Sequence, residues 1–492
     1  MRQHIHEMKR CLTIVFLAII GVASLYADAP QLRFESPRKD TVTATSIEVV
    51  GVTSPGSEVS VAGNKVHVYN TGTFAATVDL QSGDNVIKVE ATGADGSRTE
   101  RVLRCYCAAK PVVVSVDNTA DEATMMFAEP RYVVTKEDAY LQYGNGDDRL
   151  GGSKMGFIDS GIKLKAIGAK GGLYCVRLSS TRVAYIPKRL TVEATAPMQT
   201  PVNTGSWSIT NTGKTDEVTV SLPTRLPYQY TTEETPTAIV IDIFGATDNS
   251  NWITQRTLDL GIIDHTDFRQ IDEDTYRVII YLKDKHIWGY SVGYDKGNAL
   301  RISVRHQPTE LSLKGMTIGL DAGHGGDNPG AISPSGILEK DVNLDIVLRV
   351  RELLHKRGAR TVLTRDGDTG PSMSERKRIW HEANVDLAVS VHNNAAGSYT
   401  VDGTAILYKH SFDRELAQCV TRRMLQTGLK LFGIVGNFNF SLNAVTFCPN
   451  ILVEGMFMSS PEDEERLADA DFRQQVALRI VQGIEDYLKQ CR

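Results

Sequence analysis

The pattern of apolar residues changes once along this chain, near Pro308, and that change limits the folds that the chain can adopt. Before Pro308, apolar and polar residues alternate in short runs separated by turn-forming residues, which predicts all-β modules. After Pro308, short apolar runs alternate with segments of helical periodicity, which predicts an α/β domain with a mainly parallel sheet flanked by helices. Because 492 residues are more than one hydrophobic core usually serves, we expect a multidomain chain.

The turn signals and composition shifts place the boundaries of these units. In the first β-rich segment, alternating residues are punctuated by turns such as Ser54-Pro-Gly56, at a spacing typical of a β-sandwich. The third contains Trp288-Gly-Tyr290, whose rings we expect in a core rather than on a binding surface. We expect these units: a signal peptide, 1–29; three all-β modules, 30–110, 130–196 and 203–308; and the α/β domain, 311–492.

The N-terminus has the order of features of a secretory signal peptide. Lys9 and Arg10 are followed by the apolar run Cys11–Leu25 and by small residues up to Ala29. The run is shorter than the roughly 20 residues that span a membrane, which favours a cleaved signal over the alternative of an uncleaved anchor. We therefore expect an exported protein of the periplasm or cell envelope, with no stable membrane span after signal cleavage.

Charge and cysteine content narrow the class of protein further. The formal net charge is −5, from 54 basic and 59 acidic residues without a basic block, so charge gives no support for nucleic acid as a partner. One of the seven cysteines, Cys11, lies in the expected signal peptide. In an exported chain the others permit either disulfides or buried free thiols, and both alternatives stay open: Cys105, Cys107, Cys175, Cys419, Cys448 and Cys491.

Four side chains of the α/β domain suggest a metal site. His324, His392 and Glu454 each lie at or just beyond the carboxyl end of an expected strand, and Glu339 lies where the next helix begins. Parallel strands place such residues on one edge of the sheet, where α/β folds bind their ligands. Two imidazoles and one carboxylate are a usual protein complement for catalytic zinc. We expect the glycines around His324 to leave room for a substrate.

Each of these residues also has a simpler explanation. Gly323–Gly326 could be a structural turn or an anion-binding nest, and Glu339 could be a solvated carboxylate at a helix start. His392 could be a histidine satisfied within the fold, followed by turn-forming asparagines. Glu454 is harder to dismiss, because a carboxylate that leaves a buried strand needs a partner or water. Taken together, the four residues favour a metal site.

Periodicity and capping residues predict the elements of the α/β domain. Ser460 followed by Pro461 and three acidic residues predicts a helix N-terminus. We expect the following: strands Met316–Leu320, Thr361–Leu363 and Val385–Val391; helices Asp341–Lys356 and Ser374–Ala383; and final helices that extend from Ser460 to Leu488.

The last 180 or so residues resemble the zinc-dependent N-acetylmuramoyl-L-alanine amidases. The resemblance implies Zn²⁺ as cofactor, with His324, Glu339 and His392 as its ligands and Glu454 as the catalytic carboxylate. It also implies peptidoglycan as substrate. Adjacency alone suggests that Asn393 or Asn394 binds substrate. The motifs that carry the resemblance are these: Leu320-Asp-Ala-Gly-His-Gly-Gly326, Glu339, Leu363-Thr-Arg-Asp366, Ser374-Glu-Arg376, Ser390-Val-His-Asn-Asn394 and Leu452-Val-Glu-Gly455.

Two segments depart from the pattern of that family. After its last glutamate this chain has Gly455-Met-Phe-Met-Ser-Ser460, and Asn437–Leu442 lacks the arginine common there. Some relatives insert an inhibitory helix between the second histidine and the last glutamate. The segment Tyr408–Asn450 has room for one ordinary helix and little more, so we expect no built-in plug.

The β-rich segments resemble modules of exported bacterial proteins. The first, with Gly51–Gly56 and Gly83–Val89, resembles bacterial immunoglobulin-like modules, and the second resembles a bacterial SH3-like barrel. The third resembles the β-domains that precede cell-wall amidases. Such modules could contact the cell wall, and two alternatives to the amidase remain: a wall-binding or adhesin-like protein, and a zinc peptidase that acts within the stem peptide.

Overall fold

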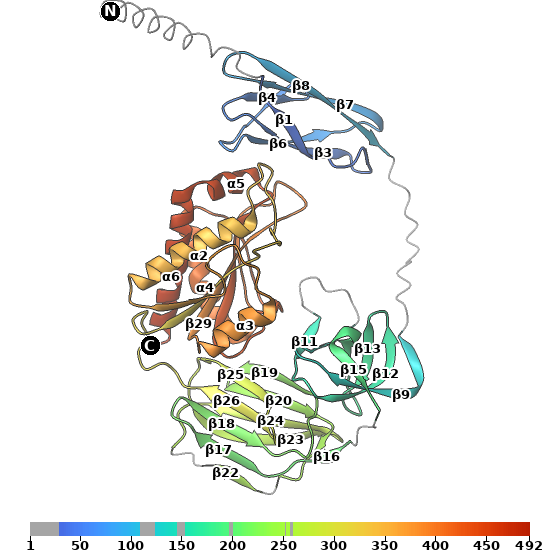
Figure 1. Ribbon diagram of the computed structural model, residues 1–492, viewed down its shortest axis with the longest axis vertical. Coiled ribbons are helices and arrows are strands. Elements are labelled where there is room, and N and C mark those ends of the chain that lie inside the picture. The colour runs from blue at the N-terminus through green and yellow to red at the C-terminus, as the bar shows by residue number, and fades with distance from the viewer. Residues whose placement is uncertain (1–28, 109–123, 145–152, 196–199, 251, 256–258) are drawn as a thin grey trace, which may run out of the picture.

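The computed structural model describes residues 29–108, 124–144, 153–195, 200–250, 252–255 and 259–492. Residues 1–28, which hold nearly all of the expected signal peptide, lie outside the described residues. Figure 1 shows three β-rich regions and a C-terminal region in which helices flank a sheet. Of the described helices, none has an apolar stretch long enough to cross a bilayer.

The first β-rich region contains two sheets, of three and five strands, that enclose one core. Alternate residues of its strands are buried, as Val49, Phe74 and Val89 illustrate, because successive side chains point to opposite faces of a sheet. The strands are β1 (Leu32–Ser36), β2 (Thr41–Val42), β3 (Ser46–Thr53), β4 (Glu58–Val61), β5 (Asn64–Val66), β6 (Thr73–Asp79), β7 (Gly83–Thr92) and β8 (Arg98–Cys107).

The second region is a seven-stranded sheet in which every pairing is antiparallel. Its buried residues belong to the same apolar cluster as those of the third region, so these two regions share a core. The strands are β9 (Met125–Thr135), β10 (Tyr140–Gln142), β11 (Lys154–Phe157), β12 (Lys163–Lys170), β13 (Leu173–Arg177), β14 (Val183–Pro187) and β15 (Thr191–Ala194).

The third region contains sheets of five, four and two strands. The five-stranded sheet and the four-stranded sheet both contribute to the shared core, for example through Val218 and Ile241. The strands are β16 (Val202–Asn203), β17 (Trp207–Asn211), β18 (Thr215–Val220), β19 (Tyr228–Glu234), β20 (Thr237–Phe244), β21 (Ala246–Thr247), β22 (Ile253–Gln255), β23 (Ile263–Asp272), β24 (Thr275–Leu282), β25 (Tyr290–Tyr294) and β26 (Leu300–Arg305).

The C-terminal domain contains one six-stranded sheet in the order β28-β27-β29-β32-β30-β31. Four of its five strand pairs are parallel and the pair of β30 with β32 is antiparallel, so the sheet is mixed. The strands are β27 (Thr317–Ala322), β28 (Arg360–Leu363), β29 (Leu387–Asn394), β30 (Thr404–Leu407), β31 (Leu431–Val435) and β32 (Asn450–Phe457), and the helices are α2 (Glu339–His355), α3 (Met373–Glu382), α4 (Arg414–Met424), α5 (Pro461–Ala468) and α6 (Ala470–Gln490).

Helices cover both faces of this sheet (Figure 1). Val389 and Val391 of β29 share a core cluster with residues of α2, α4 and α6, whereas Ala388 packs with Trp380 of α3 in another cluster. Alternate residues of β29 thus face opposite layers, as expected of a central strand buried on both sides. The layered arrangement leaves the carboxyl ends of β27 and β29 available for a site.

The helix boundaries agree with the sequence predictions to within about two residues, the usual spread of such assignments. Pro461 occupies the first turn of α5, and the Ser460 side chain accepts a hydrogen bond from the backbone N–H of Asp463, which confirms the predicted cap. Three features were not predicted: strand β30, the mostly exposed edge strand β31, and the apolar face that α4 and α6 share.

The predicted aromatic segment Trp288-Gly-Tyr290 joins the third region to the C-terminal domain. Trp288 is 1% exposed and lies in the core of the C-terminal domain, with its ring 6.0 Å from that of Tyr487. The backbone N–H of Tyr290 donates to the carbonyl oxygen of Thr446 at 2.7 Å, and the Thr446 hydroxyl donates to the carbonyl oxygen of Tyr290 at 2.7 Å. The segment is buried as expected, but Trp288 lies in the core of the C-terminal domain, whereas Tyr290 lies in the core shared by the second and third regions.

The first region contacts loops at the carboxyl edge of the C-terminal sheet. Thr73 Oγ1 donates to Oε2 of the buried Glu464, in the first turn of α5, at 2.5 Å. Arg33 donates to the carbonyl oxygen of Pro334 at 2.8 Å, in the loop before α2. These contacts place the first region beside the loops that carry the candidate site residues (Figure 1).

The six cysteines of the described residues are all free and buried, which decides between the two alternatives left open by the sequence. Cys105 and Cys107 lie two apart on β8, and their pattern of burial is that of apolar core residues. Cys11 lies outside the described residues.

Candidate metal centre

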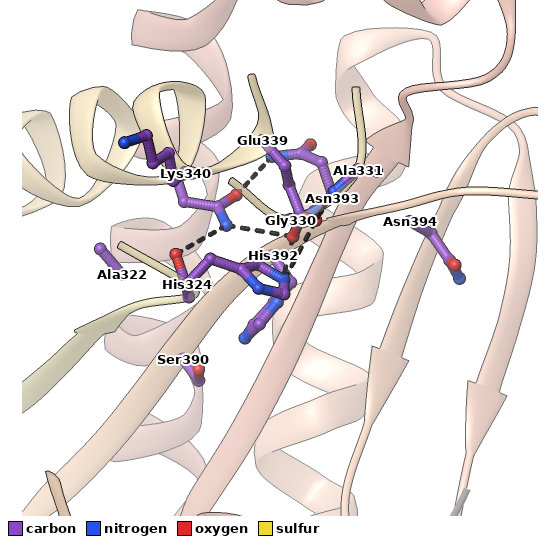
Figure 2. Close-up of polar contacts among 12 residues, drawn as sticks. Ala322, His324, Gly330, Ala331, Glu339, Lys340, Ser390, His392, Asn393 and Asn394 are labelled. Carbon is purple, nitrogen blue, oxygen red and sulfur yellow. Dashed lines mark hydrogen bonds and ion pairs between the residues drawn. The ribbon is translucent and has the colours of Figure 1, made fainter. Parts of the chain in front are cut away.

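His324, Glu339 and His392 meet beside the carboxyl ends of the central strands, and their ligand atoms all lie within 4.8 Å of one another. Nε2 of His324 is 3.1 Å from one carboxylate oxygen of Glu339, and Nδ1 of His392 is 3.1 Å from the other. Figure 2 shows the two rings beside the Glu339 carboxylate. The structure therefore brings together the three side chains that the sequence suggested as ligands.

The loop between β27 and α2 has the backbone geometry that this approach requires. His324 has a φ of +62°, in the left-handed region that non-glycine residues seldom adopt. A Cβ on Gly323 would lie 2.2 Å from the ring of His392, and one on Gly330 would lie 2.4 Å from Oε2 of Glu339. We expected these glycines to make room for a substrate, but at Gly323 the space is filled by His392.

The strand register places Glu454 next to the cluster. Glu454 lies within β32, directly opposite His392 of β29 in the parallel register, and not at the strand end that the sequence predicted. The apolar run before Glu454 continues after it as Gly455-Met-Phe457, so the strand extends beyond the expected end. Among the described residues, its buried Oε2 has no hydrogen-bond partner.

Burial and neighbouring charges shift the pKa values of these groups. Burial raises the pKa of Glu454 to about 7, although nearby His392 lowers it. Burial also raises the pKa of Glu339, but the hydrogen bonds from His324 and His392 outweigh burial, and the net pKa is well below the usual range. Burial lowers the pKa of His392, yet Glu339 and Glu454 raise it more. An ionised carboxylate thus lies between the two imidazoles.

The donor set fits a divalent transition metal such as zinc. Two imidazole nitrogens and a carboxylate oxygen are available, and the ionised state favoured for Glu339 is the one that binds a cation. The unpartnered oxygen of Glu454 is a second group whose surroundings call for a ligand or water. The residues present therefore fit the cofactor that the sequence suggested, with Glu454 left free of the ligand set.

Asn343 fixes the orientation of Glu339, a role that the sequence analysis missed. Its side-chain N–H groups donate to Oε1 of Glu339 at 3.1 Å and to the carbonyl oxygen of Gly323 at 3.2 Å. Asn343 lies one helical turn after Glu339 on α2 and is fully buried. The spacing of four residues on one helix face was the signal that could have identified it.

The two asparagines that follow His392 differ in position. Asn393 is 1% exposed, donates to Asn343 at 2.8 Å and accepts a hydrogen bond from the backbone of Met456 at 3.1 Å. In this structure the Asn393 side chain is buried and engaged within the protein, and its suggested contact with substrate stays a prediction. Asn394 lies apart from the ligand cluster in Figure 2, and its proposed contact with substrate stays a prediction.

A buried ion pair anchors the loop that carries His324. Arg376 of α3 donates to Oδ1 of Asp321 at 2.6 Å, and to the carbonyl oxygens of Ala322 and His324 at 2.9 and 2.7 Å. Both charged side chains are almost inaccessible, at 2% and 1%. Arg365 likewise donates to the Ala322 carbonyl oxygen, at 2.8 Å. Two buried arginines from different segments therefore hold the backbone around His324.

Two family models match this chain. Residues 318–486 match the family N-acetylmuramoyl-L-alanine amidase, and residues 207–304 match the AMIN domain. The chain thus carries a C-terminal domain of the N-acetylmuramoyl-L-alanine amidase family, preceded by an AMIN domain in the third β-rich region. The ligand cluster and Glu454 all lie inside the amidase match.

Individual relatives cover a limited part of the chain. This chain is 33% identical over 177 residues to a Staphylococcus epidermidis protein described as "Probable cell wall amidase LytH". The matched segment is 36% of this chain and 59% of the relative. This chain is also 33% identical over 182 residues to "N-acetylmuramoyl-L-alanine amidase LytC" of Bacillus subtilis, 36% of each chain. The catalytic domain of CwlV from Bacillus (Paenibacillus) polymyxa var. colistinus is 32% identical over 35% of this chain and 98% of that domain, with a TM-score of 0.34.

Proposed function

We propose that this protein is a zinc-dependent N-acetylmuramoyl-L-alanine amidase that cleaves peptidoglycan between N-acetylmuramic acid and the L-alanine of the stem peptide. The observation that carries the proposal is the meeting of His324, Glu339 and His392 with a free carboxylate, Glu454, beside them. The match of residues 318–486 to the amidase family supports this choice of reaction among zinc hydrolases.

The chain's own residues divide the chemistry between them. His324, Glu339 and His392 would hold Zn²⁺, which supplies an activated water and polarises the scissile carbonyl when bound. Glu454 would accept the proton of the attacking water and then donate it to the departing amine of L-alanine, so that the amine leaves as a neutral group. A carboxylate whose pKa burial raises to about 7 suits both steps near neutral pH.

The remaining modules support a role at the cell wall. We propose that residues 30–110 form an immunoglobulin-like module and residues 130–196 an SH3-like one, which together with the AMIN domain position the catalytic domain on peptidoglycan. The LytH relative is described as a cell wall amidase, and the AMIN domain match lies directly before the catalytic domain. We propose export to the periplasm or cell envelope, with residues 1–29 as the signal.

Digestion of purified peptidoglycan tests the function against its alternatives. The amidase is expected to release intact stem peptides that carry a free L-alanine amine, and removal of zinc by a chelator should abolish that release. A zinc peptidase would release peptide fragments and leave L-alanine attached to the glycan. A wall-binding or adhesin-like protein would pellet with peptidoglycan and release nothing. Either of the last two results would overturn the proposal.

A further inference from the structure

A second group of metal-ligating side chains lies where the AMIN domain meets the catalytic domain: His286, Glu415 and Cys491. Their ligand atoms all lie within 4.8 Å of one another. His286 lies in the loop between β24 and β25, Glu415 in the first turn of α4, and Cys491 directly after α6. Three elements that are distant in sequence, from two domains, thus present donor groups to one point.

A second carboxylate, that of Asp284, lies beside the imidazole of this group. Nε2 of His286 is 3.1 Å from Oε2 of Glu415, and Nδ1 is 3.4 Å from Oδ1 of Asp284. Oδ1 of Asp284 also accepts the backbone N–H of His286 at 3.0 Å, which fixes its position. A carboxylate on the ring nitrogen that faces away from the ligand point is the usual support of a metal-binding histidine.

The environment of the group is buried but not sealed. His286 is 8% exposed and Cys491 is 4% exposed, whereas the side chain of Glu415 is 46% exposed and leaves a path for solvent. An ion pair of His286 with Glu415 would account for two of these residues. It would not account for the buried thiol of Cys491, whose sulfur lies within 4.8 Å of the ligand atoms of both other residues.

We propose that His286, Glu415 and Cys491 bind a zinc ion that fastens the AMIN domain to the catalytic domain. Imidazole, thiolate and carboxylate are the three ligand types of protein zinc sites, and a water molecule would complete a tetrahedral set. On binding, the Cys491 thiol releases its proton to solvent, while the imidazole is neutral and the carboxylate ionised. The ion would hold the loop that, two residues after His286, inserts Trp288 into the catalytic core.

Metal content and a cobalt spectrum test this site separately from the catalytic one. The full-length protein is kept reduced, loaded with Zn²⁺, freed of excess metal and analysed for zinc per chain. Wild type is expected to hold two equivalents, and Cys491→Ser and His324→Ala one each. With Co²⁺ instead, a thiolate-to-cobalt charge-transfer band is expected in wild type and in His324→Ala but not in Cys491→Ser, because only the second site contains a thiol.

The controls make each outcome decisive. Cys105→Ser removes a buried thiol of the first region and should leave both the zinc content and the cobalt band unchanged, while Glu415→Gln should lower zinc content without altering a buried side chain. The proposal would be overturned if wild type bound one equivalent of zinc and Cys491→Ser bound the same amount. It would also be overturned if the cobalt charge-transfer band survived in Cys491→Ser. If Cys491→Ser lost zinc and His324→Ala did not, the second site would be upheld. The same result would refute His324 as a ligand of the catalytic zinc.

Discussion

At the scale of single residues, Glu339 and Glu454 differ in their surroundings, and the proposed chemistry depends on that difference. Both are acidic and both lie beside His392. The carboxylate of Glu339 pairs with two imidazoles, whereas one oxygen of Glu454 is buried without a hydrogen-bond partner in the described part of the chain. Under the proposed function, environment and not residue type would assign one carboxylate to the ligand set and leave the other for proton transfer.

The first prediction separates these two roles. Glu454→Gln is expected to retain catalytic zinc and lose about 10²- to 10⁴-fold in turnover, because glutamine fills the same space but cannot carry a proton between water and amine. His324→Ala is expected to lose activity and one equivalent of zinc together. Metal analysis beside a peptidoglycan assay measures both. An inactive His324→Ala protein with the zinc content of wild type would contradict the ligand assignment.

Asp321 carries a prediction about pH. Burial raises the pKa of Asp321, but Arg376 and then His392 lower it more, and the net pKa is below its usual value. A depressed pKa in the folded state means that the carboxylate stabilises the fold above its unfolded pKa of about 3.9, and that this stabilisation is lost as pH falls toward the folded pKa.

Asp321→Asn should therefore lower the free energy of unfolding at pH 7 by about 3–5 kcal/mol, because Arg376 would stay buried without a counter-charge. The difference from wild type should shrink as pH falls below about 4. Urea unfolding at several pH values measures it. Arg378→Gln is a matched control, because its pair with Glu382 is exposed and should contribute less than about 1 kcal/mol. Equal midpoints for wild type and Asp321→Asn would refute the role of the pair.

At the scale of elements, the loop between β27 and α2 acts as a unit that presents His324. Gly323 is the point where this loop passes the ring of His392. Gly323→Ala should therefore displace one imidazole and weaken zinc binding by about 10- to 100-fold while the protein stays folded. Gly397→Ala is the matched control, since a Cβ there meets nothing within 4 Å. Zinc titration with a competing chelator measures both variants, and equal affinities would contradict this account.

The elements also show how far sequence reasoning reaches. The helices α2, α3 and α5 were expected from apolar periodicity and the Ser460 cap. The meeting of His324, Glu339 and His392 was expected from two strand ends and a helix start. The position of Glu454 within β32 was not expected, because the run Ile451–Val453 gives no sign of where the strand stops. β31 was missed although its residues, Leu431-Phe-Gly-Ile-Val435, are nearly all apolar, and the structure places it mostly exposed at the edge of the sheet.

The sequence did not predict which side chains hold the site residues in position. Arg365 and Arg376 stand in motifs that carried the family resemblance, but a charged residue in a sequence is normally expected at the surface. Only the fold shows that Arg365 donates to the carbonyl oxygen of Gly323 and Arg376 to that of His324. Adjacency to His392 likewise does not tell whether the side chain of Asn393 points toward a substrate or into the core, where it donates to Asn343.

At the scale of the whole molecule, the catalytic domain is not an independent unit. Residues 311–492 contain the whole candidate site, yet the core of that domain also contains Trp288 of the AMIN domain. Arg305, the last residue of β26, adds bonds to Asp386 at 2.5 Å and to the carbonyl oxygen of Val385 at 2.5 Å. A fragment that begins at Leu311 would lose all of these contacts, so a fair comparison of full-length and truncated enzyme keeps the AMIN domain.

The last prediction concerns this joint. Because the indole N–H of Trp288 has no hydrogen-bond partner among the described residues, Trp288→Ala removes packing alone, and the cavity should cost about 3–5 kcal/mol of unfolding free energy. Trp252→Ala is the matched control, since Trp252 is 68% exposed and its loss should change stability by about 0.5 kcal/mol or less.

Denaturant unfolding, followed by fluorescence and by loss of activity, tests whether Trp288 couples the two domains. In wild type the two transitions should coincide, whereas in Trp288→Ala activity should disappear at lower denaturant, before the AMIN domain unfolds. If both variants unfold like wild type, the two domains are joined by other contacts and Trp288 is not what couples them.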